Sequence, residues 1–233
     1  MISMWNGKKK AITFSFDDGV WQDAKLIEIF NKYGLKGTFN LNSGVFGSTN
    51  TYIPFGKPIC RDRLKENEVK EIYEGHEIAV HTLTHPNLTE QTEEEVIRQV
   101  DEDRKNLERI FGYPIVGMAY PCGGVNNDAR VAAIIRENTP IRYARTITST
   151  FGFELQKENL LQFNATAHFL NQRMEEIVDT FLALETDEPK LLYIWGHSYE
   201  LDAHEKWEWF DALCQKLSGK SDIFYGTNKE VLL

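Results

Sequence analysis

Cysteine is scarce in this sequence, and its scarcity excludes a disulfide-bonded scaffold. The 233 residues include three cysteines, Cys60, Cys122 and Cys214, which are odd in number and far apart. Their spacing matches no metal-binding cysteine pair, and it indicates no disulfide framework. Cysteine usage of this kind is typical of a reducing compartment.

Long hydrophobic runs and an excess of basic charge are also missing. No apolar run approaches the roughly 20 residues that a membrane-spanning helix needs. The formal net charge of -9 argues against a general affinity for nucleic acid or for an anionic membrane, because both require a basic face. The N-terminal stretch contains lysines, but no apolar segment with a small-residue cleavage site follows it. We therefore expect a cytoplasmic protein if Met1 is the natural start, and this expectation fails if a leader was removed.

The sequence does contain enough apolar material for a sizeable core, since 42% of its residues are hydrophobic. Short apolar runs alternate with helical periodicity from end to end. Strands are expected at 11–16, 36–41, 76–80, 115–120, 142–146, 160–165 and 191–195, with a final short one at 223–225. Helices are expected at 21–33, 64–75, 92–111, 128–137, 172–184 and 205–217. This order predicts an α/β fold, a complete or incomplete (β/α) barrel, as a single domain over residues 1–233.

One segment interrupts the alternation. Residues 42–63 are rich in Gly, Ser, Thr, Asn and Pro. A loop of this length without structure of its own is usually a functional cover or is disordered. We expect a cover.

Two adjacent aspartates stand at the end of the first expected strand, in the stretch SFDDG. Asp17 and Asp18 repel each other, and each needs solvent or a counter-charge. Asp-Gly is also a common turn dipeptide, so this stretch alone fits a solvated turn as well as a functional site. Reactive groups of parallel α/β folds collect at the carboxyl ends of strands. The residues at the other strand ends therefore decide whether this stretch is a solvated turn or a functional site.

Histidines follow two further strand ends. His81 and His85 form an H-x-x-x-H in HTLTH, and His197 follows the strand at 191–195 in WGH. The spacing lets both imidazoles of HTLTH converge on one point, and Pro86 disfavours a helix that continues through His85. A pair of surface histidines near a turn would show the same spacing. With a carboxylate from another strand end, the pair predicts a three-ligand metal site with positions open to water, as in catalytic zinc sites.

The blocks SFDDG, HTLTH, AYPCG and WGH, in this order, resemble the conserved blocks of the polysaccharide deacetylases, carbohydrate esterase family 4 with its NodB-homology domain. The resemblance covers most of the chain, from residue 11 to about 201. It implies a distorted, incomplete (β/α) barrel of seven-stranded TIM-like type. It also implies a metal-dependent hydrolase that removes acetyl groups from N- or O-acetylated sugars, so an acetylated saccharide is the expected partner. The implied cofactor is one divalent ion, Zn²⁺ first, with Co²⁺, Ni²⁺, Fe²⁺ or Mn²⁺ as alternatives. The roles implied by motif position are general base for Asp17, metal ligand for Asp18, His81 and His85, and general acid for His197.

Two positions depart from the family's pattern. Ala119 stands where the third block usually has an arginine that orients the base. Cys122 stands where that block usually has an aromatic residue whose backbone N–H helps to hold the oxyanion, and a backbone donor survives the change of side chain. Arg145 is our candidate for the missing arginine, because a guanidinium can hold a carboxylate by two hydrogen bonds. An ordinary salt bridge or a solvated place at the barrel rim is the alternative for Arg145.

Aromatic residues near the motifs are candidate substrate contacts. Tyr120 lies in the third block, and Trp21 follows the aspartates, where it could stack on a sugar or simply pack. Tyr199 and Glu200, directly beyond His197, are expected to line the pocket.

Two other functions compete with a sugar deacetylase. One is a metal-dependent hydrolase of a small non-sugar amide on the same fold, since we expect no leader that would direct this chain to a cell wall. The other is a catalytically decayed carbohydrate-binding domain, motivated by the missing arginine at Ala119. The intact aspartates and histidines of the motifs argue against decay.

Overall fold

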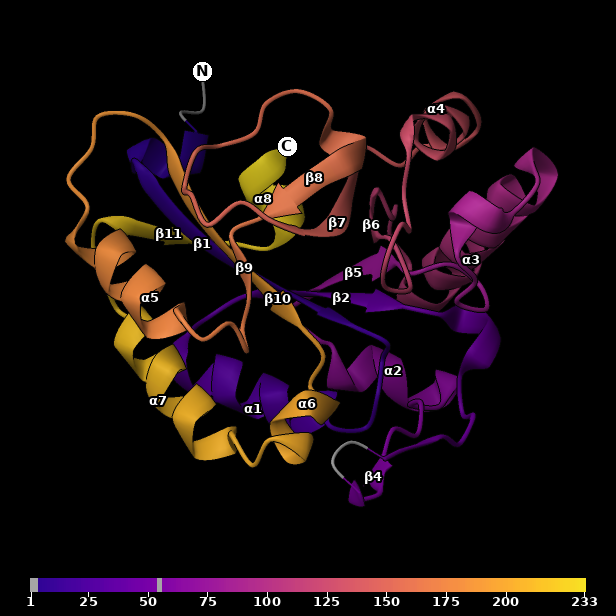
Figure 1. The fold of residues 1–233 in the computed structure, drawn as a ribbon, viewed down its shortest axis with the longest axis horizontal. Helices are drawn as coiled ribbons and strands as arrows, with labels where there is room; N and C mark the ends of the chain where they lie inside the picture. The colour runs from indigo at the N-terminus through magenta and orange to yellow at the C-terminus, as the bar shows by residue number, and fades with distance from the viewer. Residues whose placement is uncertain (1–3, 54–55) are drawn as a thin grey trace.

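The computed structural model describes residues 4–53 and 56–233. Its centre is a nine-stranded sheet in the order β8-β7-β6-β5-β2-β1-β10-β9, with β11 paired to β1 (Figure 1). The strand pairs of this sheet are parallel. Within the described residues β8 and β9 do not pair with each other, although only Thr166 separates them along the chain. The predicted α/β fold with a distorted, incomplete barrel is confirmed.

The strands of the large sheet lie close to their expected positions. Their bounds are β1 Lys10–Asp17, β2 Gly37–Leu41, β5 Glu77–Val80, β6 Gly117–Ala119, β7 Tyr143–Ser149, β8 Phe163–Ala165, β9 Ala167–His168, β10 Lys190–Gly196 and β11 Ile223–Tyr225. The first half of the strand expected at 160–165 is instead the 3-10 turn η5 (Leu160–Gln162). The two-residue strand β9 was not predicted, because so short a strand carries no periodicity.

Helices cover the outside of the strands, with α3 on one side and α5 and α7 on the other (Figure 1). Their bounds are α1 Asp23–Tyr33, α2 Glu66–Ile72, α3 Glu93–Phe111, α4 Ala129–Asn138, α5 Met174–Ala183, α6 Tyr199–Ala203, α7 Trp207–Leu217 and α8 Asn228–Leu232. Six of them fall in the expected ranges to within one residue, whereas the five-residue helices α6 and α8 were not predicted. No helix of the described residues is long and apolar enough to cross a membrane.

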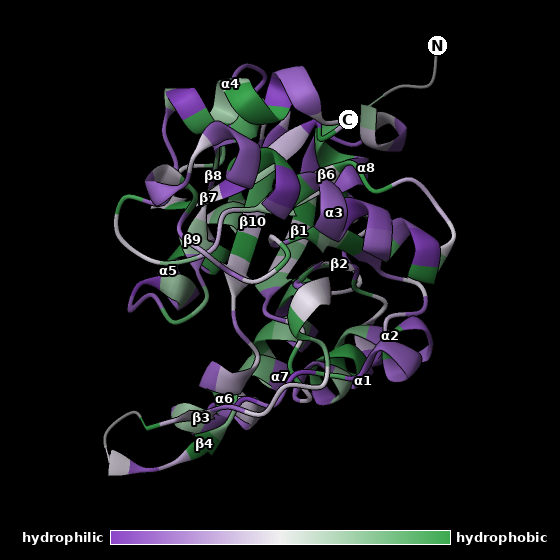
Figure 2. Cartoon of the chain, turned by 90° about the vertical axis from the view of Figure 1, so that its right-hand side faces the viewer, coloured by the Kyte–Doolittle hydropathy of each residue, from purple (hydrophilic) through white to green (hydrophobic). Residues whose placement is uncertain are grey.

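The segment 42–63 has structure of its own, contrary to the expectation of an irregular loop. It contains the 3-10 turn η2 (Ser43–Val45) and an antiparallel pair of two-residue strands, β3 (Thr51–Tyr52) and β4 (Ile59–Cys60). Figure 2 shows this hairpin extending from the body of the molecule beside α6. The cysteines behave as expected, because Cys60, Cys122 and Cys214 are all free.

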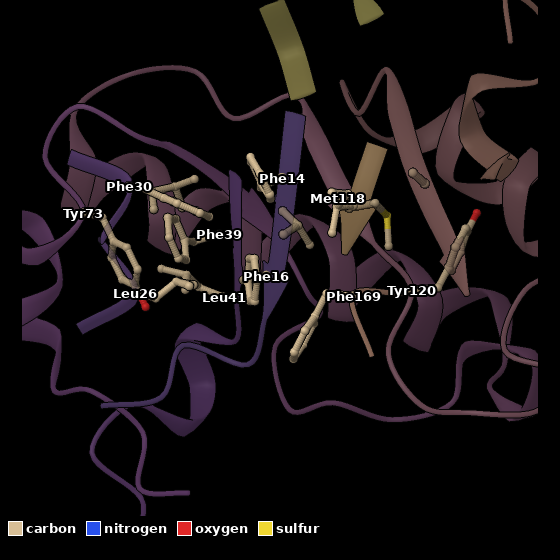
Figure 3. Close-up of a cluster of buried hydrophobic side chains, with 14 of the residues drawn as sticks. Phe14, Phe16, Leu26, Phe30, Phe39, Leu41, Tyr73, Met118, Tyr120 and Phe169 are labelled. Carbon is tan, nitrogen blue, oxygen red and sulfur yellow. The ribbon is translucent and has the colours of Figure 1, made fainter. Parts of the chain in front are cut away.

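An aromatic cluster fixes α1 against the sheet. Phe14 and Phe16 project from one face of β1, and the Phe30 ring lies 4.8 Å and 6.0 Å from their ring centroids. Figure 3 shows these rings together with Phe39 of β2. The left-handed Gly34 (φ 67°) then ends α1. Burial of rings of this size dominates the packing energy of such a core.

The opposite face of β1 points into the barrel. Because side chains alternate along a strand, Thr13, Ser15 and Asp17 share this inner face. All eight residues of β1 are buried, and the inner ones pair with polar groups of other elements. Thr13, for example, donates to Asn228 at the start of α8 over 2.9 Å. The alternation therefore places Asp17 inside the barrel, at the carboxyl end of its strand.

Candidate active site

The carboxyl ends of β1, β5, β6 and β10 converge on one cavity of about 280 Å³. Residues of the aspartate pair, HTLTH, the third block and WGH all reach it. Its lining consists of Asp17, Asp18, Arg61, His81, His85, Tyr120, Cys122, Gly123, Ile147, Trp195, His197 and Tyr199. Larger hollows exist elsewhere, such as one of about 800 Å³ near Lys8 and Leu184, but they gather no comparable ligand set. Chemistry rather than size marks this cavity as the candidate site.

Three potential metal ligands face one another in the cavity. The ligand atoms of Asp18, His81 and His85 all lie within 4.8 Å of one another. The Asp18 Oδ1 atom is 3.8 Å from His81 Nε2 and 3.4 Å from His85 Nε2. One carboxylate and two imidazoles are a donor set that suits a divalent transition metal with open positions.

Hydrogen bonds at the other ring nitrogens orient both imidazoles. His81 Nδ1 lies 2.9 Å from the Ala119 carbonyl oxygen, which can only accept, so the proton is on Nδ1 and the lone pair of the neutral ring is on Nε2. Burial lowers the pKa of His81 to about 4, so the ring is neutral at pH 7. His85 Nδ1 faces Cys122 Sγ at 3.8 Å, which leaves its Nε2 towards Asp18.

The donor set fits a metal because one of its buried atoms lacks a partner. Asp18 Oδ1 accepts no hydrogen bond among residues 4–53 and 56–233. Arg63 Nη1 lies 3.0 Å from this oxygen, but its hydrogen bond is directed to the backbone oxygen of Asp18. A buried carboxylate oxygen without a donor is costly unless a cation binds it.

The backbone around the site is strained. Asp18 (φ 86°), Thr82 (φ 69°), His85 (φ 66°) and Cys122 (φ 68°) occupy the left-handed region that favours glycine. Strain of this kind persists only where the surroundings over-determine it, and it concentrates at functional sites. His81 and His85 lie in irregular backbone with a bend between them and not in a helix, as Pro86 indicated.

Asp17 lies beside the cluster and is held by a guanidinium. Arg145 Nη2 is 2.6 Å from its Oδ1 and 2.5 Å from its Oδ2, and Asn40 Nδ2 donates to Oδ1 over 2.8 Å. Burial favours the neutral acid, but Arg145 and the nearby histidines hold the pKa of Asp17 below its usual range. Arg145 is 0% exposed, so it is no solvated rim residue.

His197 follows β10, the strand that pairs with β1, and it faces Asp17. Its Nε2 lies 3.9 Å from Asp17 Oδ2, and its Nδ1 lies 3.3 Å from Glu200 Oε2. That oxygen also accepts the His197 backbone N–H and lies 3.0 Å from His168 Nε2. Burial opposes the charged imidazolium, but Glu200 and the two aspartates outweigh it and raise the pKa of His197 to about 9. His197 is thus protonated near neutral pH, with Nε2 directed into the cavity.

Gly196 sets the position of His197 at the end of β10. A Cβ atom on Gly196 would lie 2.2 Å from Cδ1 of Phe169, closer than any real contact. Only glycine permits this approach, which aims the following histidine at the cavity.

Sequence reasoning missed several residues that support the site. Asp103 on α3 is buried and accepts the His81 N–H over 3.2 Å and the Ser43 N–H over 2.7 Å. Burial raises the pKa of Asp103 to about 8. Its place on the same helix face as Val100 and Leu107 was a usable signal, because a charged residue on an apolar face needs a partner. Arg63 lies in the polar segment 42–63, where nothing in the local sequence distinguishes it from a solvated arginine.

The predicted substrate contacts have different positions. Cys122 and Tyr120 line the cavity, although the Tyr120 hydroxyl donates to the Leu161 carbonyl over 2.7 Å. The Cys122 N–H has no backbone acceptor in the described part of the chain. Trp21 is not brought to the site, because it sits in the turn before α1, is 47% exposed and is absent from the described lining.

Comparison with known proteins identifies the family of this chain. A profile described as polysaccharide deacetylase matches residues 5–137. The chain is 28% identical over 124 residues to the peptidoglycan-N-acetylmuramic acid deacetylase PdaC of Bacillus subtilis, a match that covers 52% of this chain and 23% of that protein. It is 29% identical over 119 residues to the peptidoglycan-N-acetylglucosamine deacetylase PgdA of Listeria monocytogenes, covering 50% and 22%. The match thus spans less than a quarter of the length of either relative.

A solved structure shows the same fold. The family 4 acetyl xylan esterase of Clostridium thermocellum, in complex with a cobalt ion, superposes with a TM-score of 0.58 at 13% identity, over 95% of this chain and 89% of that one. The cytoplasmic location expected from the sequence gains no support from the relatives, two of which are named for peptidoglycan. The profile match covers more than half of the chain and contains the aspartate pair and HTLTH. The chain belongs to the polysaccharide deacetylase family.

Proposed function

We propose that this chain is a metal-dependent hydrolase that removes acetyl groups from N- or O-acetylated sugars, and that residues 1–233 form its catalytic domain. One observation carries the proposal. Asp18 Oδ1, which accepts no hydrogen bond from the described residues, faces the Nε2 atoms of His81 and His85, directly beside the buried carboxylate of Asp17. The relatives named above act on acetylated peptidoglycan and xylan sugars, which supports a saccharide substrate.

Asp18, His81 and His85 would hold the ion. A bound divalent ion would polarise the acetyl carbonyl and lower the pKa of water at the site. Zn²⁺ suits the imidazole and carboxylate donors, and Co²⁺, Ni²⁺, Fe²⁺ or Mn²⁺ remain alternatives. The cobalt ion in the xylan esterase structure supports a divalent metal in this fold.

Asp17 would act as the general base. The reaction adds water to the acetyl carbon and breaks its bond to the sugar nitrogen or oxygen, which yields acetate and a free amine or alcohol. Asp17 takes one proton from the water, because Arg145 keeps it ionised and fixes both its oxygens. Arg145 thereby acts as a positioning residue for the base.

His197 would act as the general acid. Glu200 binds Nδ1 and keeps the ring charged, so the proton on Nε2 is available to the departing nitrogen or oxygen. The backbone N–H of Cys122 is the candidate donor to the oxyanion. Cys122 is no nucleophile in this scheme, because burial and nearby carboxylates raise the pKa of its thiol.

Acetate release tests the function. Purified protein would be incubated with acetylated chito-oligosaccharides, peptidoglycan fragments, acetylated xylan and a set of small acetamides, with and without added Zn²⁺ or Co²⁺. We expect metal-stimulated release of acetate from at least one saccharide class. Acetate release from small acetamides alone would show that the substrate is a non-sugar amide and not an acetylated sugar. Saccharide binding without any acetate release would indicate a decayed carbohydrate-binding domain.

A further inference from the structure

Three arginines approach the cavity, and one of them has no acidic partner. Arg145 is paired with Asp17, and Arg63 lies 3.0 Å from Asp18. Arg61 is the arginine that lines the cavity itself, and no carboxylate of the described residues forms an ion pair with it. Its positive charge is therefore not balanced by an ion pair within the described residues.

Aromatic rings hold Arg61 in place without neutralising it. Its Cζ lies 5.2 Å from the ring centroid of Tyr52 and 4.9 Å from that of Tyr199. The two rings meet edge to face at 5.8 Å. A guanidinium held by ring faces keeps its charge and its in-plane N–H donors, so it can still bind an anion.

The contacts of Arg61 with Tyr52 and Tyr199 connect the β3–β4 hairpin to the segment that follows His197. Arg61 directly follows β4, Tyr52 belongs to β3, and Tyr199 lies two residues beyond His197. Figure 2 shows the hairpin and α6 side by side, and the two elements are in contact. The segment 42–63 thus contributes a cation to the cavity.

We propose that Arg61 selects acetylated sugars that carry a carboxylate close to the acetyl group. This inference rests on the proposed function and specifies its substrate class. A carboxylate offers a guanidinium two oxygens for parallel, charge-assisted hydrogen bonds, whereas a neutral hydroxyl offers one uncharged oxygen. Such a carboxylate occurs on a lactyl ether of an N-acetylated sugar, as in N-acetylmuramic acid, or on a uronic acid beside an O-acetylated sugar. The shared feature is the anion, and matched substrates distinguish the two sources.

The test compares each acid with its neutral methyl ester. kcat/KM for acetate release would be measured on N-acetylmuramic-acid oligomers and their lactyl esters, and on glucuronate-bearing acetylated xylo-oligosaccharides and their esters. We expect the wild-type protein to prefer one acid over its ester by roughly 10- to 100-fold, the range of a charge-assisted hydrogen bond. Added salt should reduce this ratio.

Variants assign the preference to Arg61. Arg61→Ala should bring the acid-to-ester ratio to about one, and Arg61→Lys should restore part of it through charge alone. Lys57→Ala is the matched control, because it removes a cation of the same hairpin that pairs with Glu205 and lies outside the cavity lining. This control should keep the wild-type ratio.

A second readout does not depend on turnover. Calorimetry would compare binding of the deacetylated acids and their esters by the wild-type protein and by Arg61→Ala. An acid-to-ester ratio that Arg61→Ala leaves unchanged, or an equal loss on acid and ester, overturns the role of Arg61 even if acetate is released. If no saccharide releases acetate, the proposed function fails, and the binding comparison still decides whether Arg61 recognises a carboxylate.

Discussion

Ala119 and Arg145 are register partners on the neighbouring strands β6 and β7. Ala119 occupies the position where the family usually has an arginine, and Arg145 presents its guanidinium from the next strand at the same level. In the sheet order, β6, β5 and β2 lie between β7 and β1. Arg145 therefore reaches Asp17 across the interior of the barrel, while its Cζ lies 4.3 Å from the ring centroid of Trp195.

We expect Arg145→Lys to fail to restore full activity. Nη2 of Arg145 contacts both oxygens of Asp17 while Nε and Nη1 bind Ser15 and the Thr146 carbonyl, and a single ammonium cannot replace all of these bonds.

Arg145→Ala should move the acidic limb of the kcat/KM profile to higher pH. The sign follows because removal of a positive neighbour raises the pKa of a carboxylate that acts in its ionised form. The variant should also lose about 3–5 kcal/mol of unfolding free energy, the cost of an unpaired buried charge. Arg142→Lys, on an exposed arginine nearby, is the control. An unchanged pH profile in Arg145→Ala would leave the site without an arginine partner.

Glu200 is expected to set the alkaline limb of activity through His197. A general acid is lost as pH rises through its pKa, which is about 9 for His197 beside Glu200. Glu200→Gln removes the carboxylate and lowers this pKa, so the alkaline limb of kcat/KM should move to lower pH. Glu205→Gln, at an exposed carboxylate, should leave the profile unchanged. An identical alkaline limb in Glu200→Gln would argue against His197 as the acid.

Metal content should depend on the HTLTH histidines and not on Asp17. Purified wild-type protein is expected to carry about one divalent transition metal per chain, as measured by mass spectrometry. The double variant His81→Ala/His85→Ala should lose it. Asp17→Asn should keep the metal but lose roughly 10²–10⁴ in rate, the contribution of a positioned base. Full metal occupancy in the folded double variant would contradict the assignment of His81 and His85 as metal ligands.

The aromatic cluster should dominate stability. Phe30 is 0% exposed and contacts the rings of Phe14, Phe16, Phe39 and Phe210. Phe30→Ala should cost about 3–5 kcal/mol in the free energy of unfolding measured with urea. Phe151→Ala, at a ring that is 47% exposed, should change it by less than about 0.5 kcal/mol. Similar losses for both variants would contradict this account of the core.

The sequence predicted those features that depend on hydrophobic periodicity and motif spacing, namely most strands and helices and the motif residues of the site. The apolar and polar alternation of β1 and the amphipathic face of α1 follow from local residue order, and so does the gathering of Asp17, Asp18, His81, His85 and His197 at strand ends. A need for charge compensation at Asp17 pointed to Arg145. The catalytic roles of these residues stay predictions.

The remaining features depend on contacts between distant segments. The hairpin β3–β4 and the helix α6 are too short to show a period, so Arg61 and Tyr199 could not be placed together. Arg63 reaches Asp18 only because the chain returns beside Val20, where the two segments form an isolated bridge. Trp21 follows the aspartates in sequence, but the turn into α1 directs it to solvent.

Metal titration tests the central claim most directly. Protein stripped of metal by a chelator would be mixed with an acetylated saccharide substrate, and acetate release would be followed as Zn²⁺ is added in steps. We predict no release from the stripped protein, and a rise that reaches its plateau at about one equivalent per chain, as expected for a single three-ligand site at Asp18, His81 and His85. Full acetate release by the metal-free protein would contradict the account.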